Sequence, residues 1–327
     1  MRSRIGLLAG AAALMLASLP TAAQAAVKVA LLCPARCSNL PATIDPSDRA
    51  FLAGLERAGY VQSRNLSIDV SGVGVGRARL PEAARKLVER KVDVIVAVGN
   101  DSIRAAREAT STTPIVMVTI ADAVEEGLVA SLARPGANVT GLSLPLAQLA
   151  AQHIGLLKEI SPRLARVAMI STRTGDVAQE RFARIERAAE TTGVRLSLLR
   201  VATLPDLEQA LSPMSPERPD ALLLLEEGKS PIRSEITLFA LENRLATAGS
   251  ARSFVEGGGL LAYGPYFPDL YERVAAYVGK ILNGARPGDL PVEEPIRFEL
   301  YVNKATAETI GLAIPEKLLM GADRVIE

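Results

Sequence analysis

Residues 125–143, EEGLVASLARPGANVTGLS, contain the junction that decides how this chain is divided. Residues 125–133 have the apolar spacing typical of an amphipathic helix, and residues 139–142 have the composition of a β-strand. Between them, residues 134–138 join a helix stop to a turn, because proline lacks the N–H that a helix needs and glycine tolerates positive φ. We expect this junction to mark the passage of the chain from one lobe into another.

Strands and helices alternate on both sides of the junction. Strands are expected at 27–33, 66–70, 92–98, 115–120, 139–142, 167–171, 194–201 and 221–225, and helices at 47–59, 81–90, 102–109, 125–133, 147–160, 177–192, 204–211 and 232–246. Runs such as VDVIVAVG, residues 92–99, are apolar on both faces, as parallel strands covered by helices are. The sequence therefore predicts an α/β protein of two doubly wound, Rossmann-like lobes.

The first 25 residues have the features of a secretory signal peptide. Two arginines precede an uncharged apolar run at 5–19, and the small-residue site Ala23-Gln24-Ala25 follows Pro20. The run is shorter than the ~20 residues that a membrane-spanning helix needs. We expect cleavage after Ala25 and a soluble periplasmic protein. The rest of the chain is nearly neutral, with a net charge of about −1, which gives no electrostatic reason to expect nucleic acid or an anionic membrane as a partner.

Six motifs resemble one protein family. They are GYVQSRNLSIDV, KLVERKVDVIVAVG, EEGLVASLARPGANVTGLS, SFVEGGGLLAYGP, KILNGARPGDLPVEEPIRFELYVN and GLAIPEKLLMGADRVIE, and they span the chain after the signal peptide. The chain resembles the substrate-binding proteins of ABC transporters in the family that includes tryptophan- and tyrosine-binding members. The resemblance implies a type 1 periplasmic-binding-protein fold, in which two α/β lobes joined by a three-segment hinge hold a small ligand.

The resemblance also implies lobe boundaries. We expect the first lobe to contain residues 26–141 and about 265–293, and the second to contain 142–264 and about 294–327. The second crossing is expected near residues 259–265, and the third at the strand within 295–303. The chain departs from the family pattern at Asp122-Ala123, at Ala137 and at 245–247, which puts the identity of the ligand in doubt.

Polar residues follow two strands of the first lobe. After the third strand, Asn100, Asp101 and Ser102 open a helix, where free N–H groups and the helix dipole favour a carboxylate. The alternative is an ordinary N-cap by Asp101 or Ser102. Thr119 and Asp122 follow the fourth strand, and the Asp122 carboxylate is a candidate partner for a ligand ammonium, with an N-cap as its alternative.

The second lobe offers further candidates at its strand ends. Thr172 and Thr174 follow one strand and supply hydroxyl groups, and Glu226 follows another and supplies a carboxylate. Ordinary solvated loops are the alternative for all three. Tyr263 is a candidate aromatic wall for the ligand, or else a packing residue of the hinge. The chain has no tryptophan, which makes a sugar ligand less expected.

Cys33 and Cys37 stand at the end of the first strand. In an oxidising compartment they are candidates for a disulfide, and metal or redox chemistry is the alternative. His153 is the only histidine, and we expect it to be structural. We therefore expect no metal and no cofactor. Because nucleophile-elbow and P-loop motifs are also missing from the sequence, we expect no enzyme activity.

These observations predict an exported solute-binding protein of an ABC importer. It would capture an amino acid or a similar small zwitterion or carboxylate between its lobes and deliver it to a membrane permease, acting as a monomer without nucleic acid. A ligand-sensing receptor subunit for a membrane kinase is the alternative, and an exported hydrolase is a third.

Overall fold

The computed structural model describes residues 26–35, 37–38, 40, 45–119, 121–171, 176–201, 203–211, 218–225 and 232–327. The expected signal peptide lies outside these ranges, as do three predicted ligand residues, Thr172, Thr174 and Glu226. Within the described part of the chain, no helix combines the length and apolar character required to span a membrane.

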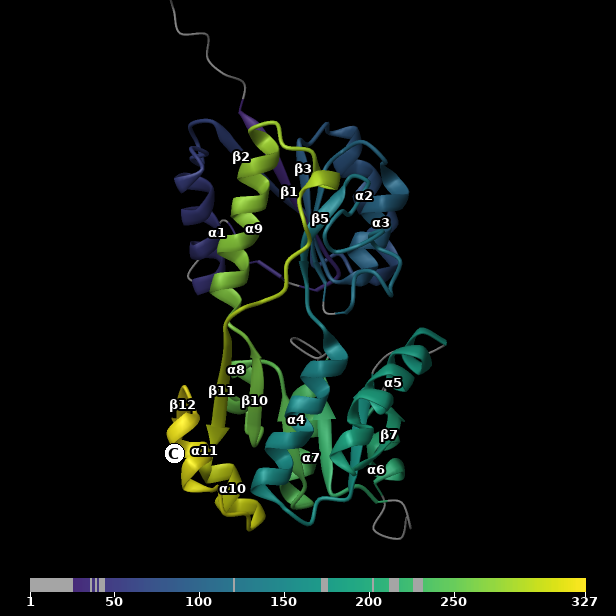
Figure 1. Ribbon diagram of the computed structural model, residues 1–327, viewed down its shortest axis with the longest axis vertical. Coiled ribbons are helices and arrows are strands. Elements are labelled where there is room, and N and C mark those ends of the chain that lie inside the picture. The colour runs from purple at the N-terminus through teal and green to yellow at the C-terminus, as the bar shows by residue number, and fades with distance from the viewer. Residues whose placement is uncertain are drawn as a thin grey trace, which may run out of the picture.

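The first lobe is built on a five-stranded parallel sheet in the order β2-β1-β3-β4-β5. Its strands are β1 (Val27–Cys33), β2 (Leu66–Val73), β3 (Val94–Val98), β4 (Ile115–Thr119) and β5 (Val139–Ser143). Helices α1 (Pro46–Arg57) and α9 (Phe267–Leu282) cover one face, and η1 (Arg77–Arg79) leads into α2 (Leu80–Glu89), which covers the other face with α3 (Asn100–Ala109). Figure 1 shows α9 beside α1 although the two are more than 200 residues apart.

Strands β1, β3 and β4 of this sheet are largely apolar on both faces because both faces are covered. In β1, Val29 and Leu31 pack toward α1 and α9, and Ala30 and Leu32 pack toward α2 and α3. The alternation of side chains along a strand explains this division. The continuous apolar runs of the sequence therefore correspond to buried parallel strands.

The second lobe is built on a seven-stranded sheet in the order β12-β11-β10-β9-β8-β6-β7, in which β10 and β11 form the antiparallel pair. The strands are β6 (Arg166–Ser171), β7 (Arg195–Arg200), β8 (Ala221–Leu224), β9 (Ala246–Gly249), β10 (Leu261–Pro265), β11 (Phe298–Asn303) and β12 (Arg324–Ile326). One face is covered by α4 (Leu146–Ile160), α5 (Asp176–Ala189), α10 (Lys304–Ile310) and α11 (Glu316–Gly321). The other face carries α6 (Leu204–Ala210), α7 (Arg233–Glu242) and α8 (Arg252–Glu256). Short 3-10 turns lie at η2 (Glu190–Thr192) and η3 (Pro287–Asp289).

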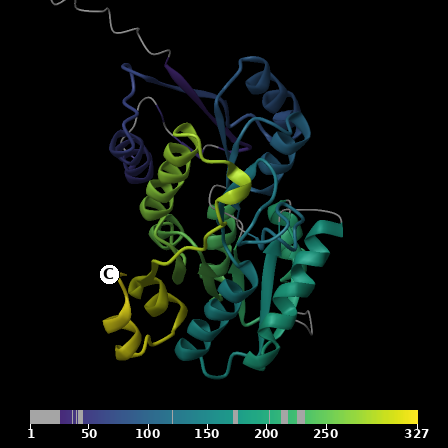
Figure 2. The ribbon, with the colours of Figure 1, turned by 45° about the horizontal axis from the view of Figure 1, so that its top comes forward.

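Three segments cross between the lobes, and Figures 1 and 2 show them from two directions. The first runs from β5 into α4, the second from β10 into α9, and the third from η3 into β11. They are tied together, since the Ser143 N–H donates to the Glu293 carbonyl oxygen at 2.9 Å and the Tyr266 N–H to that of Arg297 at 3.0 Å. Both β5 and β10 enter a crossing at their carboxyl ends, so the carboxyl edges of the parallel strands in each sheet face the other lobe.

The predicted helix at 125–133 is wrong, because this segment forms a series of turns. The Asp122 Oδ1 accepts the N–H groups of Val124 and Glu125, which starts a single turn. Gly127 then adopts φ +65° and ends that turn, in the way that glycine ends helices. Leu128 and Val129 are nevertheless buried, so the apolar spacing of the sequence reflects burial and not a helix.

The junction at 134–138 lies inside the first lobe. β5, which follows it, pairs with β4 in parallel from Ile115↔Val139 to Thr119↔Ser143. The chain therefore leaves the first lobe only after Ser143, one strand later than the junction suggested. The helix predicted at 232–246 is also too long, because α7 ends at Glu242 and the chain then turns through Arg244, at φ +54°, into β9.

Candidate functional site

Asn100 and Thr119 meet at the carboxyl edge of the first sheet, where β3 and β4 are neighbours. The Thr119 hydroxyl donates to Asn100 Oδ1 at 2.5 Å, and the two residues are 2% and 4% exposed. This bond turns the amide so that Nδ2 has no partner among the described residues. A buried donor without an acceptor costs about 1–3 kcal/mol. The position is therefore one where a bound group would gain a hydrogen bond that the protein itself does not supply.

Among the described residues, no side chain caps the N-terminus of α3. Its N-cap is Gly99, at φ +85°, so the alternative of capping by Asp101 or Ser102 is wrong. Asp101 instead pairs with Arg77 at 3.3 Å. Ser102 is fully buried, and its hydroxyl has no partner among the described residues. The helix dipole makes this end of α3 suited to an anionic group.

Asp122 organises the turn that begins the segment at 123–127. Its Oδ1 accepts the N–H of Val124 at 2.9 Å and that of Glu125 at 3.0 Å. The capping alternative for Asp122 is therefore present in the structure. Contact between this carboxylate and a ligand stays a prediction.

In the second lobe, Tyr263 lies in a small aromatic cluster. Its ring stacks on Phe298, with centroids 5.5 Å apart and planes 14° apart. The ring of His153 meets it edge-on, with centroids 6.2 Å apart. Burial raises the pKa of the Tyr263 phenol, which keeps the group neutral. The partly buried pair of rings lies near the carboxyl end of β10, on the edge that faces the first lobe.

His153 is a packing residue, as expected. It is fully buried, with Nδ1 2.6 Å from the Leu149 carbonyl oxygen and Nε2 2.6 Å from that of Gly249. Burial lowers the pKa of its imidazole, because the charged form loses hydration. Among the described residues, no group of three or more His, Cys, Asp or Glu side chains has the arrangement of a metal site. His153 thus ties α4 to the end of β9.

Ser250 was not predicted from the sequence. It follows β9 directly, and its buried hydroxyl has no partner among the described residues. Recognition of residues 246–249 as a strand would have nominated it by the same strand-end rule that nominated Asn100. The strand was missed because four small residues follow a predicted helix without a break. Phe298 was also missed, since its contact with Tyr263 arises across an antiparallel pair.

Cys33 and Cys37 form a disulfide at the carboxyl end of β1, with Cα atoms 6.3 Å apart. The Tyr271 hydroxyl of α9 donates to the Cys37 carbonyl oxygen at 3.1 Å. The disulfide therefore holds the loop after β1 at the same edge of the sheet as Asn100 and Thr119.

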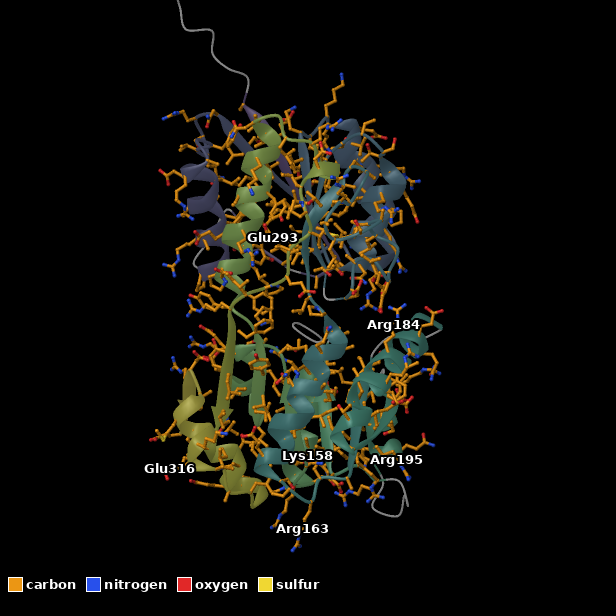
Figure 3. All side chains as sticks on the ribbon, viewed as in Figure 1. Lys158, Arg163, Arg184, Arg195, Glu293 and Glu316 are labelled. Carbon is orange, nitrogen blue, oxygen red and sulfur yellow. A yellow bond between two sulfur atoms is a disulfide. The ribbon has the colours of Figure 1, made fainter. Side chains whose placement is uncertain are left out.

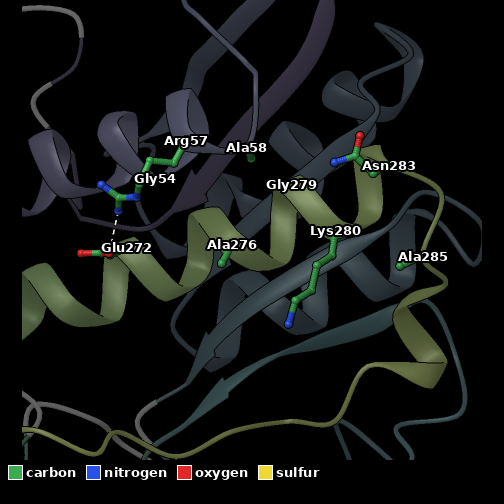
Figure 4. A pocket seen from close by; sticks show the side chains of 9 residues that line it. All are labelled: Gly54, Arg57, Ala58, Glu272, Ala276, Gly279, Lys280, Asn283 and Ala285. Atoms are coloured by element: carbon green, nitrogen blue, oxygen red, sulfur yellow. Dashed lines mark ion pairs between the residues drawn. The ribbon is translucent and has the colours of Figure 1, made fainter.

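A pocket of the first lobe lies elsewhere, between α1 and α9 (Figure 4). Its lining includes Gly54, Gly279 and the ion pair of Arg57 with Glu272 at 2.6 Å. The helices are closely packed there, since a Cβ on Gly54 would lie 2.6 Å from that of Ala275. None of the predicted ligand residues lines this pocket.

Comparison with known proteins gives a consistent set of similarities. Residues 42–326 match the family model described as ABC transporter substrate binding protein. A tyrosine-binding protein of Clostridioides difficile (strain R20291) is 26% identical over 274 residues, which cover 83% of this chain and 78% of that protein.

Solved structures share the fold. A conserved domain protein from Vibrio cholerae is 29% identical, with a TM-score of 0.79, over 91% of this chain and 99% of that one. A domain from Streptococcus pneumonia, solved in complex with L-Trp, has the same TM-score at 24% identity, over 92% of this chain and all of that one.

Proposed function

Because the chain belongs to the family of ABC transporter substrate-binding proteins, we propose that it binds an amino acid between its two lobes and delivers it to a membrane permease. The lobes close on the ligand because a ligand that contacts both edges stabilises the closed arrangement by differential binding. The chain catalyses no reaction in this proposal and acts as a monomer.

The observation that carries the proposal is the set of buried polar groups at the strand ends that have no partner among the described residues. Asn100 Nδ2 and Ser102 Oγ lie in the first lobe and Ser250 Oγ in the second. Such groups are rare in folded proteins, and a bound ligand would supply the hydrogen bonds that they lack. Their position at the carboxyl edges agrees with the general location of ligands in open α/β sheets.

The chemistry of the two edges favours a zwitterion with a ring. The uncapped N-terminus of α3 and the Asn100 amide suit a carboxylate. Tyr263 and Phe298 suit an aromatic side chain. Asp122, or Glu226 outside the described residues, is the proposed partner of the ligand ammonium. Because relatives bind tyrosine and tryptophan, these two amino acids are the first to test.

We further propose that residues 1–25 direct export to the periplasm and that the mature protein begins at Ala26. The two lobes would move as units about the three crossings, with boundaries near residues 143, 265 and 294. Thr172 and Thr174 remain proposed ligand contacts of the second lobe.

The test is a thermal-shift screen of the mature chain, residues 26–327, followed by calorimetry on positive ligands. We expect L-tyrosine or L-tryptophan to raise the Tm in a concentration-dependent way, because a ligand that binds only the native state stabilises it. The bound ligand should be recovered unchanged, which separates binding from hydrolysis.

A matched control is Glu82→Gln. Glu82 lies on the exposed face of α2, where it pairs with Lys86 at 2.6 Å, and the variant should bind as the wild type does. A Tm raised by sugars or inositol and not by any amino acid would contradict the proposal.

A further inference from the structure

An ion-pair cluster joins the two lobes. Arg184 of α5 lies with Nε 3.4 Å from Glu125 Oε2 and with Nη1 3.5 Å from Glu126 Oε1. Arg104 of α3 lies 2.6 Å from the other oxygen of Glu126. Figure 3 shows Arg184 on the part of α5 that approaches the first lobe. We call Arg104, Glu125, Glu126 and Arg184 the interlobe bridge.

Contacts within the first lobe hold the first-lobe part of the interlobe bridge in place without help from Arg184. Asp122 caps the turn that carries Glu125 and Glu126. Arg107 of α3 donates to the Gly127 carbonyl oxygen at 2.6 Å. The Glu126 side chain is only 5% exposed and is paired with Arg104. This turn therefore presents two carboxylates to the second lobe, and that of Glu126 is held in place by Arg104.

The second-lobe part is equally well anchored. Phe182, Ile185 and Ala189 of α5 are buried in the core between α5, α4 and the second sheet. Arg184 is 27% exposed and belongs to the side of α5 that this core does not cover. Because α5 is fixed to its own lobe, the contact of Arg184 with the turn depends on how close the lobes are.

We propose that the interlobe bridge favours closure and that Arg184 is a positioning residue that sets ligand affinity without touching the ligand. This inference rests on the proposed function, since it concerns the closure that holds the ligand. When the lobes separate, Glu126 keeps Arg104 and regains water, so opening leaves no bare buried carboxylate. The bridge therefore biases the equilibrium between open and closed arrangements and does not lock it.

The size of the bias follows from the partial exposure of Arg184 and Glu125, whose side chains are 27% and 56% exposed. Partly exposed ion pairs make modest contributions that salt reduces. The apparent Kd varies inversely with the fraction of molecules competent to close. We expect Arg184→Ala to raise the Kd for L-tyrosine about three- to tenfold in low salt, mainly through faster dissociation. Arg184→Lys should fall between the wild type and Arg184→Ala, because it keeps the charge without the planar guanidinium.

The control is Arg187→Ala on the same helix. It removes the same charge from an exposed position that has no ion pair among the described residues. We expect its Kd to match that of the wild type. In 1 M NaCl, where the screening length is only ~3 Å, the difference between Arg184→Ala and the wild type should shrink.

Small-angle X-ray scattering tests the interlobe bridge without any ligand. We expect Arg184→Ala to have a larger radius of gyration than the wild type and Arg187→Ala in low salt. If no amino acid binds but this difference is seen, the proposed function fails and the bridge stands. If Arg184→Ala and Arg187→Ala agree in scattering and also in Kd, the bridge is overturned.

Discussion

The two edges that face each other across the crossings differ in chemistry. The edge of the first sheet presents small polar groups, Asn100, Ser102 and Thr119, all at least nine-tenths buried. The edge of the second sheet presents two stacked rings, Tyr263 and Phe298, and one buried hydroxyl, that of Ser250. One edge is suited to the charged end of a small molecule, and the other to its ring.

The difference gives a physical reason for closure. Polar donors at the first edge reach a carboxylate at close range, whereas aromatic contact requires a face of the ligand to be covered. A ligand with both features gains its full set of contacts only when both edges touch it. A ligand with one feature could bind to one lobe and leave the other free.

The largest expected effect concerns the backbone of β5 in the first sheet, at Gly141. In Gly141→Ala, the new Cβ would lie 2.2 Å from the Met117 carbonyl oxygen, and the residue would have to adopt φ +133°. We expect the free energy of unfolding to fall by about 4 kcal/mol, from overlap and backbone strain together. Urea denaturation measures it.

Gly264→Ala is the counterpart at the second edge. Its Cβ would lie 2.0 Å from the Ser250 carbonyl oxygen, and we expect a loss of about 2–3 kcal/mol. Because the overlap displaces Ser250, this variant should also weaken L-tyrosine binding. A loss below 1 kcal/mol in both variants would show that the backbone at both edges relaxes around an added methyl group.

Among the described residues, only the first edge contains a disulfide, and we expect this bond to stabilise that edge. The double variant Cys33→Ser/Cys37→Ser opens a loop with a sequence separation of 4, which in the chain-entropy model costs about 2 kcal/mol. Differential scanning calorimetry should show a lower Tm. Tm values that agree with and without reductant in the wild type would contradict a stabilising role.

The amide of Asn100 at the first edge is expected to contribute to affinity. Asn100→Ala removes the unpartnered Nδ2, and we expect a Kd for L-tyrosine about tenfold higher, which corresponds to ~1.4 kcal/mol. Calorimetry gives the Kd, and Glu82→Gln serves as the control. An unchanged Kd would remove Asn100 from the site.

Much of this arrangement could be predicted from the sequence. Continuous apolar runs at β1, β3 and β8 predict buried parallel strands, and the strand-end rule then places Asn100 and Thr119 at one edge. The two-lobed α/β fold follows from the alternation and from the family resemblance. These features depend on local composition, so the sequence contains them directly.

Other features depend on specific contacts and strand pairings that leave no recognisable pattern in the sequence. The Asp122 carboxylate starts a single turn and Gly127 ends it, although the apolar spacing continues to Leu132. At 246–249, four small residues form a strand because they pair between β8 and β10. The interlobe bridge depends on residues from two lobes and has no pattern along the chain.

The smallest expected effect concerns the ring of the second edge. Tyr263→Ala removes one ring of the stacked pair, and we expect the Kd for L-tyrosine and L-tryptophan to rise about threefold to tenfold, the usual size of an aromatic contact beyond its area. Tyr263→Phe keeps the ring and should stay close to the wild type. Binding of a small aliphatic amino acid should change less than binding of the aromatic ones, because it covers less of the ring. If Tyr263→Ala weakened all of these ligands equally, Tyr263 would serve the packing of β10 and β11, and the contrast between the two edges would reduce to the polar groups alone.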